Sequence, residues 1–271
     1  KMNKNKYLIC PNIDNKELTK NIRGFDQDNN KILTKVIQEK SLTIFLNNQE
    51  IVTLMTIGDH PEYLSIGYLL NQNMLKLNDI IKSIDYEKDV GVIVVRTSRK
   101  TNYEKKLRKK ITTSGCAQGT VFGDIYEEIQ NKKIKSRIKI KHEWIYEISK
   151  IINLTPSLYL EAGAIHGCVL CKKNVPIIYM EDVGRHNAVD KIAGYMFLNK
   201  IISKDKIFYT TGRLTSEMII KTVKMNISIL ISRSGFTSWG VELAKKTNLT
   251  LIGRAKGKRY TILSGENRLI E

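Results

Sequence analysis

The chain has 271 residues, of which 42% are hydrophobic and 27% are charged, a composition typical of a globular protein that can bury a core. No apolar run reaches the roughly 18 residues that a membrane-spanning helix needs. The basic start, residues 1–6, is followed by an apolar patch too short for a signal peptide. Four scattered cysteines are too few for a disulfide scaffold, so we expect a cytoplasmic protein with free thiols.

The formal net charge of +18 raises the alternative of nucleic-acid binding. Cations gather before Cys116, at 105–110, and after it, at 133–141. No zinc finger, RNA-binding aromatic pair or basic zipper accompanies them. Most of the charge is therefore interpreted as lysines spread over solvated faces, with a specific anionic partner as the alternative.

The first elements predict a small mixed domain over residues 31–105, preceded by a loosely ordered lead-in, residues 1–30. Two apolar, partly β-branched runs at 41–46 and 50–55 flank a short polar stretch, a pattern typical of a hairpin. Asp59 is placed to cap a helix that has Pro61 in its first turn and Glu62 at the capping-box position. A further strand is predicted over 90–96.

Residues 106–136 predict a long flexible loop between two domains. The stretch from Ile111 to Thr120 consists mainly of small and polar residues that cannot build a core, and it contains Cys116. Loops of this length are usually functional or disordered. A helix follows over about 142–152, with Trp144, Ile148, Ile151 and Ile152 on one face.

Residues 137–271 predict an α/β domain, so the whole chain belongs to the α/β class in the broad sense (α+β overall). Helices are expected near 186–200, 215–225 and 237–247, and strands near 164–171, 176–180, 207–211, 228–232 and 249–253. Alternation of this kind favours a layer of largely parallel strands covered by helices.

Four turns after the predicted strands could bind a phosphate-bearing ligand. They are 181–187, 210–213, 232–238 and 254–259, and they combine glycine, hydroxyl and cationic side chains. Such turns gather at the carboxyl ends of parallel strands, where helix N-termini attract anions. The alternative is that each turn only connects two elements. None matches a P-loop or GxGxxG, so ATP and NAD have no direct support.

Cys116 is the candidate reactive thiol, because cations a few residues upstream would favour its thiolate form. An incidental surface cysteine is the equal alternative. Cys168 and Cys171, with His166 nearby, raise the question of a metal, but no second close pair completes a zinc site. We expect them to be core residues on opposite faces of a strand, and we expect no metal site. His186 is a candidate for a site role or for a structural hydrogen bond.

The block Glu181-Asp-Val-Gly-Arg-His-Asn-Ala-Val-Asp-Lys191 resembles the signature of the FdhD family, the formate dehydrogenase accessory sulfurtransferases. The resemblance runs over roughly residues 35 to 265, and the supporting stretches are 162–166, 211–218, 241–244 and 249–253.

The resemblance implies a function as a sulfur carrier. Members of the family accept persulfide sulfur from a cysteine desulfurase and pass it to the molybdenum of a bis-molybdopterin guanine dinucleotide cofactor before the cofactor enters formate dehydrogenase. The persulfide cysteine maps onto Cys116. The cofactor-binding residues map onto a segment of six positions, which are Arg254, Ala255, Lys256, Gly257, Lys258 and Arg259. The cofactor is cargo, and no permanent cofactor is expected.

The resemblance also implies a fold similar to cytidine deaminases and a homodimer. The chain departs from many family members at one point, because Cys116-Ala117-Gln118-Gly119 stands where they have CxxC, so one thiol must carry the sulfur alone. A chaperone that binds the cofactor without transferring sulfur remains an alternative. A deaminase-type zinc hydrolase is excluded by the absence of the HxE and PCxxC ligands.

Overall fold

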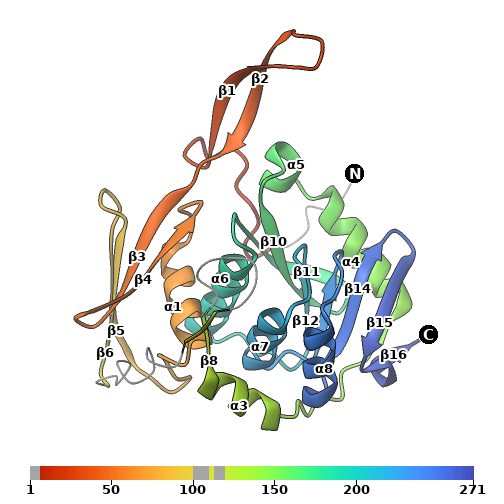
Figure 1. Ribbon diagram of the computed structural model, residues 1–271. Helices are drawn as coiled ribbons and strands as arrows, with labels where there is room; N and C mark the ends of the chain where they lie inside the picture. Colours follow the sequence, from red (N-terminus) through yellow and green to blue (C-terminus); the bar gives the residue numbers. More distant parts are fainter. Residues whose placement is uncertain (1–6, 100–109, 113–119) are drawn as a thin grey trace.

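The computed structural model describes residues 7–99, 110–112 and 120–271 and contains two main sheets with helices between them (Figure 1). The larger sheet has six strands in the order β11-β10-β12-β13-β14-β15, and the smaller has four in the order β4-β3-β6-β5. The protein is therefore mixed α and β, in agreement with the predicted class. In the part of the chain that the structure describes, no helix is long and apolar enough to cross a membrane.

The smaller sheet confirms the predicted hairpin. Its strands are β3 (Lys40–Leu46), β4 (Gln49–Thr56), β5 (Ile81–Glu87) and β6 (Val92–Thr97). Helix α1 (Pro61–Asn71) follows β4 as predicted, but the predicted cap is wrong. The residue at the N-cap is His60, in a left-handed conformation, and no side chain caps the helix. The Asp59 carboxylate lies instead against a buried ammonium, that of Lys191.

Strands β1 (Thr19–Phe25) and β2 (Lys31–Ile37) form an antiparallel hairpin that projects from the body of the molecule (Figure 1). The interpretation of residues 1–30 as a loosely ordered lead-in is wrong for 19–25, which pair with 31–37 along their whole length. This pairing leaves little trace in the local sequence pattern, because most of these side chains are exposed and no buried face imposes an alternating pattern.

The larger sheet is mixed, so the expectation of largely parallel strands is wrong. Its strands are β10 (His166–Lys172), β11 (Val175–Asp182), β12 (Lys206–Thr210), β13 (Ile229–Ser232), β14 (Thr250–Lys256) and β15 (Arg259–Ser264). Only β12, β13 and β14 pair in parallel, because helices α7 (Ser216–Lys224) and α8 (Ser238–Thr247) provide the crossovers between them. Two-residue turns join β10 to β11 and β14 to β15, and such short turns permit only antiparallel pairs.

Each face of the larger sheet has its own core. Helix α6 (Arg185–Leu198), α7 and α8 cover one face, and the core there continues through α1 into the smaller sheet. Helix α4 (His142–Leu154), which the sequence predicted over about 142–152, packs on the other face. Cys168 belongs to the first core and Cys171 to the second, and both are fully buried. This confirms that the two cysteines are core residues on opposite faces of β10.

Helices α1 and α6 join the two sheets by direct backbone contact. A Cβ added at Gly67 would lie 1.7 Å from the carbonyl oxygen of Asp190, and one added at Gly194 would lie 1.9 Å from that of Tyr63. Only glycine permits this approach, which is closer than ordinary helix packing allows.

The prediction of one flexible loop over 106–136 is wrong for the described part of this segment, which begins with a short ladder and continues into a helix. Strands β7 (Lys110–Thr112) and β8 (Thr120–Phe122) pair antiparallel, and α3 (Gly123–Asn131) follows β8 directly. Cys116 falls between the two strands and lies outside the described residues. Three short elements complete the chain: α5 (Leu158–Ala162), the pair β9 (Ile140–Lys141) with β16 (Leu269–Ile270), and a 3-10 turn, Glu266–Arg268.

Candidate phosphate-binding edge

Strands β11, β12, β13 and β14 run in the same direction, so they end at one edge of the larger sheet, called the carboxyl edge below. The first three predicted turns, 181–187, 210–213 and 232–238, lie here because each follows one of these strands. Helices α6, α7 and α8 begin at the same edge, at Arg185, Ser216 and Ser238. Their free N–H groups give the edge a partial positive charge that favours anions.

Hydrogen bonds hold the neighbouring turns together. The Ser232 hydroxyl donates to the Gly212 carbonyl at 2.6 Å and accepts from the Ser234 N–H at 2.9 Å. The Arg254 N–H in turn donates to the Ser234 carbonyl at 2.8 Å. The turns 210–213, 232–238 and 254–259 thus form one connected surface, and their positions are determined by neighbouring strands of the sheet.

Several cationic side chains converge on this surface. Arg213 is exposed, whereas Arg233 is half-buried with its guanidinium 5.1 Å from the centre of the Tyr159 ring, a cation–π contact. His166 begins β10 at this edge, and its Nδ1 lies 3.3 Å from the Thr211 hydroxyl. Burial lowers the pKa of His166, and the positive charges of Arg185, His186 and Arg213 lower it further. An anion placed among these cations would relieve their mutual repulsion.

The fourth predicted segment, Arg254–Arg259, is partly strand. Strand β14 continues to Lys256 and β15 starts at Arg259, so the turn itself is Gly257-Lys258. Arg254 has a positive φ of 55° at an irregularity between β14 and β15, beside the Ser234 turn. Ala255 is buried, while the other five residues are exposed. The segment therefore runs from the carboxyl edge outward along the last hairpin, with four cationic side chains that a ligand can reach.

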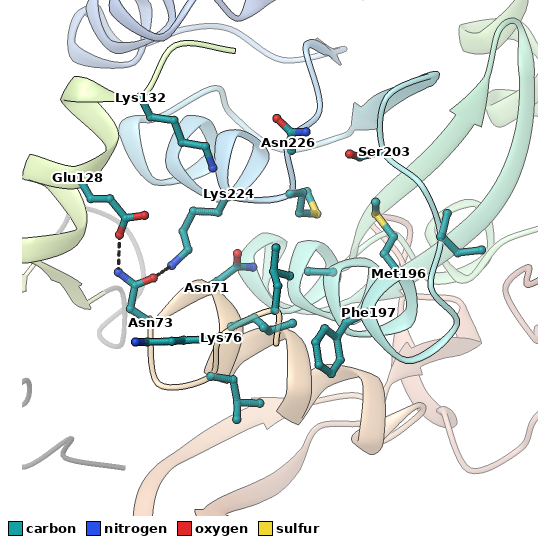
Figure 2. Close-up of a pocket in the computed structure, with 16 residues that line it drawn as sticks. Asn71, Asn73, Lys76, Glu128, Lys132, Met196, Phe197, Ser203, Lys224 and Asn226 are labelled. Atoms are coloured by element: carbon teal, nitrogen blue, oxygen red, sulfur yellow. Dashed lines mark hydrogen bonds between the residues drawn. The ribbon is translucent and has the colours of Figure 1, made fainter. Parts of the chain in front are cut away.

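A pocket of about 660 Å³ lies elsewhere, at the opposite ends of the helices (Figure 2). Helices α1, α3, α6 and α7 all end there, and their last residues contribute to its lining. Helix C-termini carry partial negative charge, about half an elementary charge each. The four helix ends therefore offset the positive charge of the lysines that line the pocket, which are Lys76, Lys132 and Lys224. Among these, Lys224 already donates to Asn73, which donates to Glu128. The pocket is therefore less suited to phosphates than the carboxyl edge.

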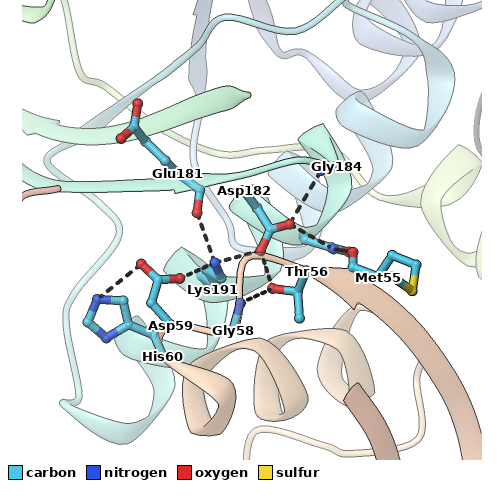
Figure 3. A network of polar contacts seen from close by, with 10 residues as sticks. Met55, Thr56, Gly58, Asp59, His60, Glu181, Asp182, Gly184 and Lys191 are labelled. Carbon is cyan, nitrogen blue, oxygen red and sulfur yellow. Dashed lines mark hydrogen bonds and ion pairs between the residues drawn. The ribbon is translucent and has the colours of Figure 1, made fainter. Parts of the chain in front are cut away.

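A buried ion network supports the carboxyl edge (Figure 3). The Lys191 ammonium is fully buried and lies against Asp182, at 2.5 Å, and Asp59, and it donates to the Glu181 carbonyl at 2.8 Å. Burial by itself lowers the pKa of Lys191, but the two carboxylates outweigh it and the pKa is raised. The Thr56 hydroxyl also donates to Asp182. The sequence marked Lys191 as part of a motif but gave no sign that Asp59, 132 positions away, is its partner.

Two other residues of the motif have structural contacts. The Asn187 side chain donates to Asp182 at 3.1 Å and to the Met55 carbonyl at 2.8 Å, so it also joins the two sheets. His186 lies with its Nε2 3.0 Å from a Glu217 carboxylate oxygen, and burial lowers the pKa of its imidazole. Of the two roles considered for His186, the structure favours the structural contact.

The chain that follows Cys116 returns to the carboxyl edge. Tyr126, in the first half of α3, accepts a hydrogen bond from the Trp239 indole N–H at 3.1 Å, and the two rings meet edge to face. Trp239 is the second residue of α8, immediately after the 232–238 turn. The described chain resumes at Thr120, and its contact with this edge follows six residues later, at Tyr126.

Nothing in the described ranges suggests a resident metal. No group of three or more histidine, cysteine or acidic side chains there could hold an ion. Burial raises the pKa of the Cys168 thiol to about 12 and that of Cys171 further still, so both remain protonated at neutral pH and are unsuited to metal binding.

Comparison with known proteins identifies the family. A model of the FdhD/NarQ family matches residues 37–270, which is most of the chain. The chain belongs to the FdhD/NarQ family.

Individual relatives agree with the match. A sulfur carrier protein FdhD from Bacillus pumilus is 30% identical over 238 residues, 88% of this chain and 91% of that protein. Another from Bacillus subtilis is 29% identical over 242 residues, 89% of this chain and 92% of that protein. A crystal structure of a proposed formate dehydrogenase accessory protein from Desulfotalea psychrophila has a TM-score of 0.74 and 25% identity, and the match covers 93% of this chain and 98% of that one.

The family signature of this FdhD/NarQ chain, residues 181–191, is also the segment that builds the ion network. It begins at the end of β11, passes through the turn at the carboxyl edge and ends at Lys191. The same residues therefore connect the smaller sheet to the carboxyl edge, which gives a physical reason for the residue types of the signature.

Proposed function

We propose that this chain is a cytoplasmic sulfur carrier for formate dehydrogenase, which holds sulfur as a persulfide on Cys116 and passes it to the molybdenum of a bis-molybdopterin guanine dinucleotide cofactor. The main support is the Tyr126–Trp239 contact, because it brings the described flank of the Cys116 segment to the cation-rich carboxyl edge. The sulfur donor is a cysteine desulfurase, and the family resemblance favours a homodimer.

The proposed division of labour follows the fold. Residues 31–105 form a small domain and 137–271 a cofactor-binding domain of the cytidine-deaminase type, and the segment between them, whose described part contains β7, β8 and α3, carries Cys116. The diphosphates of the cargo lie along the carboxyl edge and the segment Arg254–Arg259, where charge-assisted hydrogen bonds from arginine and lysine suit phosphate oxygens. No resident cofactor takes part.

Loading is a thiol exchange. The Cys116 thiolate attacks the terminal sulfur of the donor's persulfide, a new S–S bond forms on Cys116, and the donor cysteine leaves as a thiolate, so sulfur and charge balance. In release, the S–S bond breaks and Cys116 leaves as a thiolate, while the reduced metal of the cargo supplies the two electrons that convert the transferred sulfur to a sulfido ligand.

Incubation with a cysteine desulfurase and cysteine is expected to add about 32 Da, one sulfur atom, to Cys116. Mass spectrometry of peptides from the intact protein measures the addition. Cys10→Ala is the matched control, because Cys10 is a free thiol exposed at the surface and its removal should leave the loading unchanged. Sulfur found on Cys10 in place of Cys116 would contradict the proposal.

Charge reversal in the last hairpin is expected to weaken binding of the cargo. Lys258→Glu/Arg259→Glu should raise the Kd for guanosine diphosphate, used as a probe for the nucleotide ends of the cofactor, at least tenfold, measured by calorimetry. Lys245→Glu/Lys246→Glu, with the same change of charge at the far end of α8, is the control. Equal losses in both variants would indicate attraction by net charge alone.

The second candidate is a chaperone that only holds the cofactor. It needs the carboxyl edge and not Cys116, and every residue assigned to that edge lies in the described ranges. Cys116→Ala separates the two functions, since a chaperone lacking this thiol would still support active formate dehydrogenase.

A further inference from the structure

The β1–β2 hairpin, called the arm below, is a surface that the family match does not include. The matched segment starts at residue 37, the last position of β2. The arm projects from the body (Figure 1). Its Phe25 and Leu33 side chains are each 64% exposed. A lone exposed apolar residue is ordinary, but two large ones on a projecting two-stranded ribbon are typical of an interaction site.

One face of the arm combines these apolar side chains with cations. In the antiparallel register Arg23 is opposite Leu33, and Phe25 is opposite Lys31, so all four lie on the same face. Lys35, one pair further toward the base, is on this face too and pairs with Glu161 of α5. The strands contribute no acidic residue to this cationic face, and among the described residues no ion pair or hydrogen bond of the Arg23 or Lys31 side chain is found.

The arm is held in place at both ends. At the tip, the Asp26 carboxylate accepts from the N–H groups of Asp28 and Asn30, at 2.9 and 2.8 Å. At the base, Leu18 and Ile37 join a small apolar cluster. A preformed surface loses less conformational entropy when a partner binds, which favours recognition.

The base of the arm lies at the carboxyl edge. Its apolar cluster includes Leu158 of α5, Ile165 just before β10, and Val183 in the turn that follows β11. The neighbouring Tyr159 ring lies against Arg233, which belongs to the proposed phosphate site. The arm thus rises next to the place where the cargo would be held.

We propose that the cationic face of the arm docks formate dehydrogenase apoprotein through an acidic surface that carries apolar side chains. The proposal rests on the proposed function and names the contact by which the client reaches the cargo. A second copy of this chain is the poorer occupant, since two such faces carry like charges and the whole chain has a net charge of +18.

Two arm variants test the proposal against purified, cofactor-free formate dehydrogenase from the same organism, by biolayer interferometry with the full chain. Phe25→Ser/Leu33→Ser and Arg23→Glu/Lys31→Glu are each expected to raise the Kd at least tenfold. Leu77→Ser/Ile80→Ser is the matched control, because these side chains are 80% and 68% exposed near the smaller sheet. It should change the Kd less than twofold. Unchanged melting temperatures would show that the arm variants fold.

Three outcomes would overturn the docking proposal. They are wild-type affinity in both arm variants, loss of Cys116 loading by the desulfurase with normal binding of the apoprotein, and conversion of a wild-type dimer to monomers in sedimentation. Failure of the proposed function looks different, since Cys116 would then take up no sulfur while the arm variants still lost affinity for the apoprotein.

Discussion

Lys191→Met is expected to lower the free energy of unfolding by about 3–5 kcal/mol, because it leaves two carboxylates facing each other inside the protein. Lys191 is fully buried between Asp182, itself fully buried, and Asp59. Methionine has a similar length and no charge, so it leaves no large cavity. The lost stability therefore measures the cost of the two carboxylates that no longer have a cation between them. Urea unfolding followed by circular dichroism measures the change.

The effect of pH on this ion pair follows from the raised pKa of Lys191. The stabilisation is fully present below the ordinary pKa of a lysine, about 10.4, and is lost as the pH rises through the raised value in the folded protein. Wild-type protein should therefore lose stability in this alkaline range more steeply than Lys191→Met. Parallel curves for the two proteins would contradict the assignment.

Two further variants keep this prediction testable if Lys191→Met does not fold. Lys191→Met/Asp182→Asn removes one of the two carboxylate charges and should recover part of the loss, since the two residues are coupled. Lys245→Met, at an exposed lysine of α8, is the matched control and should change stability by less than about 0.5 kcal/mol.

Gly194→Ala is expected to destabilise the protein by at least about 3 kcal/mol, the upper range for overpacked sites. The direction of this change in stability is informative, because replacing glycine by alanine inside a helix normally stabilises the helix by about 1 kcal/mol. Here the new methyl group would lie 1.9 Å from the Tyr63 carbonyl oxygen, so α1 and α6 would have to separate. Thermal unfolding of the purified variant measures the loss.

Gly24→Ala is the matched control for this substitution. Gly24 lies in β1, and the nearest atom to an added Cβ is 3.9 Å away, in the Ile32 side chain. Its change in stability should be within about 0.5 kcal/mol, as at other open surface positions. A Gly194→Ala variant as stable as the Gly24→Ala variant would mean that the two helices do not meet as described.

The ion network and the glycine contact have one consequence in common. Both connect the smaller sheet with the helix that begins at the carboxyl edge, through Asp59 in one case and α1 in the other. The turn that contains Arg185 is therefore held from two directions. Variants at either place are expected to disturb the carboxyl edge as well as overall stability.

The sequence by itself determined most of the secondary structure and the location of the cation-rich turns. Helices α4, α6, α7 and α8 and the strands β10 to β14 were predictable because a buried stripe or a short apolar run is a local pattern, whereas α3, α5 and β15 were not predicted. The burial of Cys168 and Cys171 on opposite faces followed from the two-residue period of a strand. The identity of Cys116 as the sulfur-carrying thiol remains a prediction.

Only the tertiary structure decided which distant groups meet. The pairing of Lys191 with Asp59 joins residues 132 positions apart, and the backbone contact of Gly67 with Asp190 depends on how two helices cross. The sequence also did not predict that the larger sheet is mixed or that residues 19–37 form the arm, since strand pairing and exposed two-stranded ribbons leave little trace in local composition. Local patterns report the environment of each side chain, whereas the partner that provides that environment is fixed only when the whole chain packs.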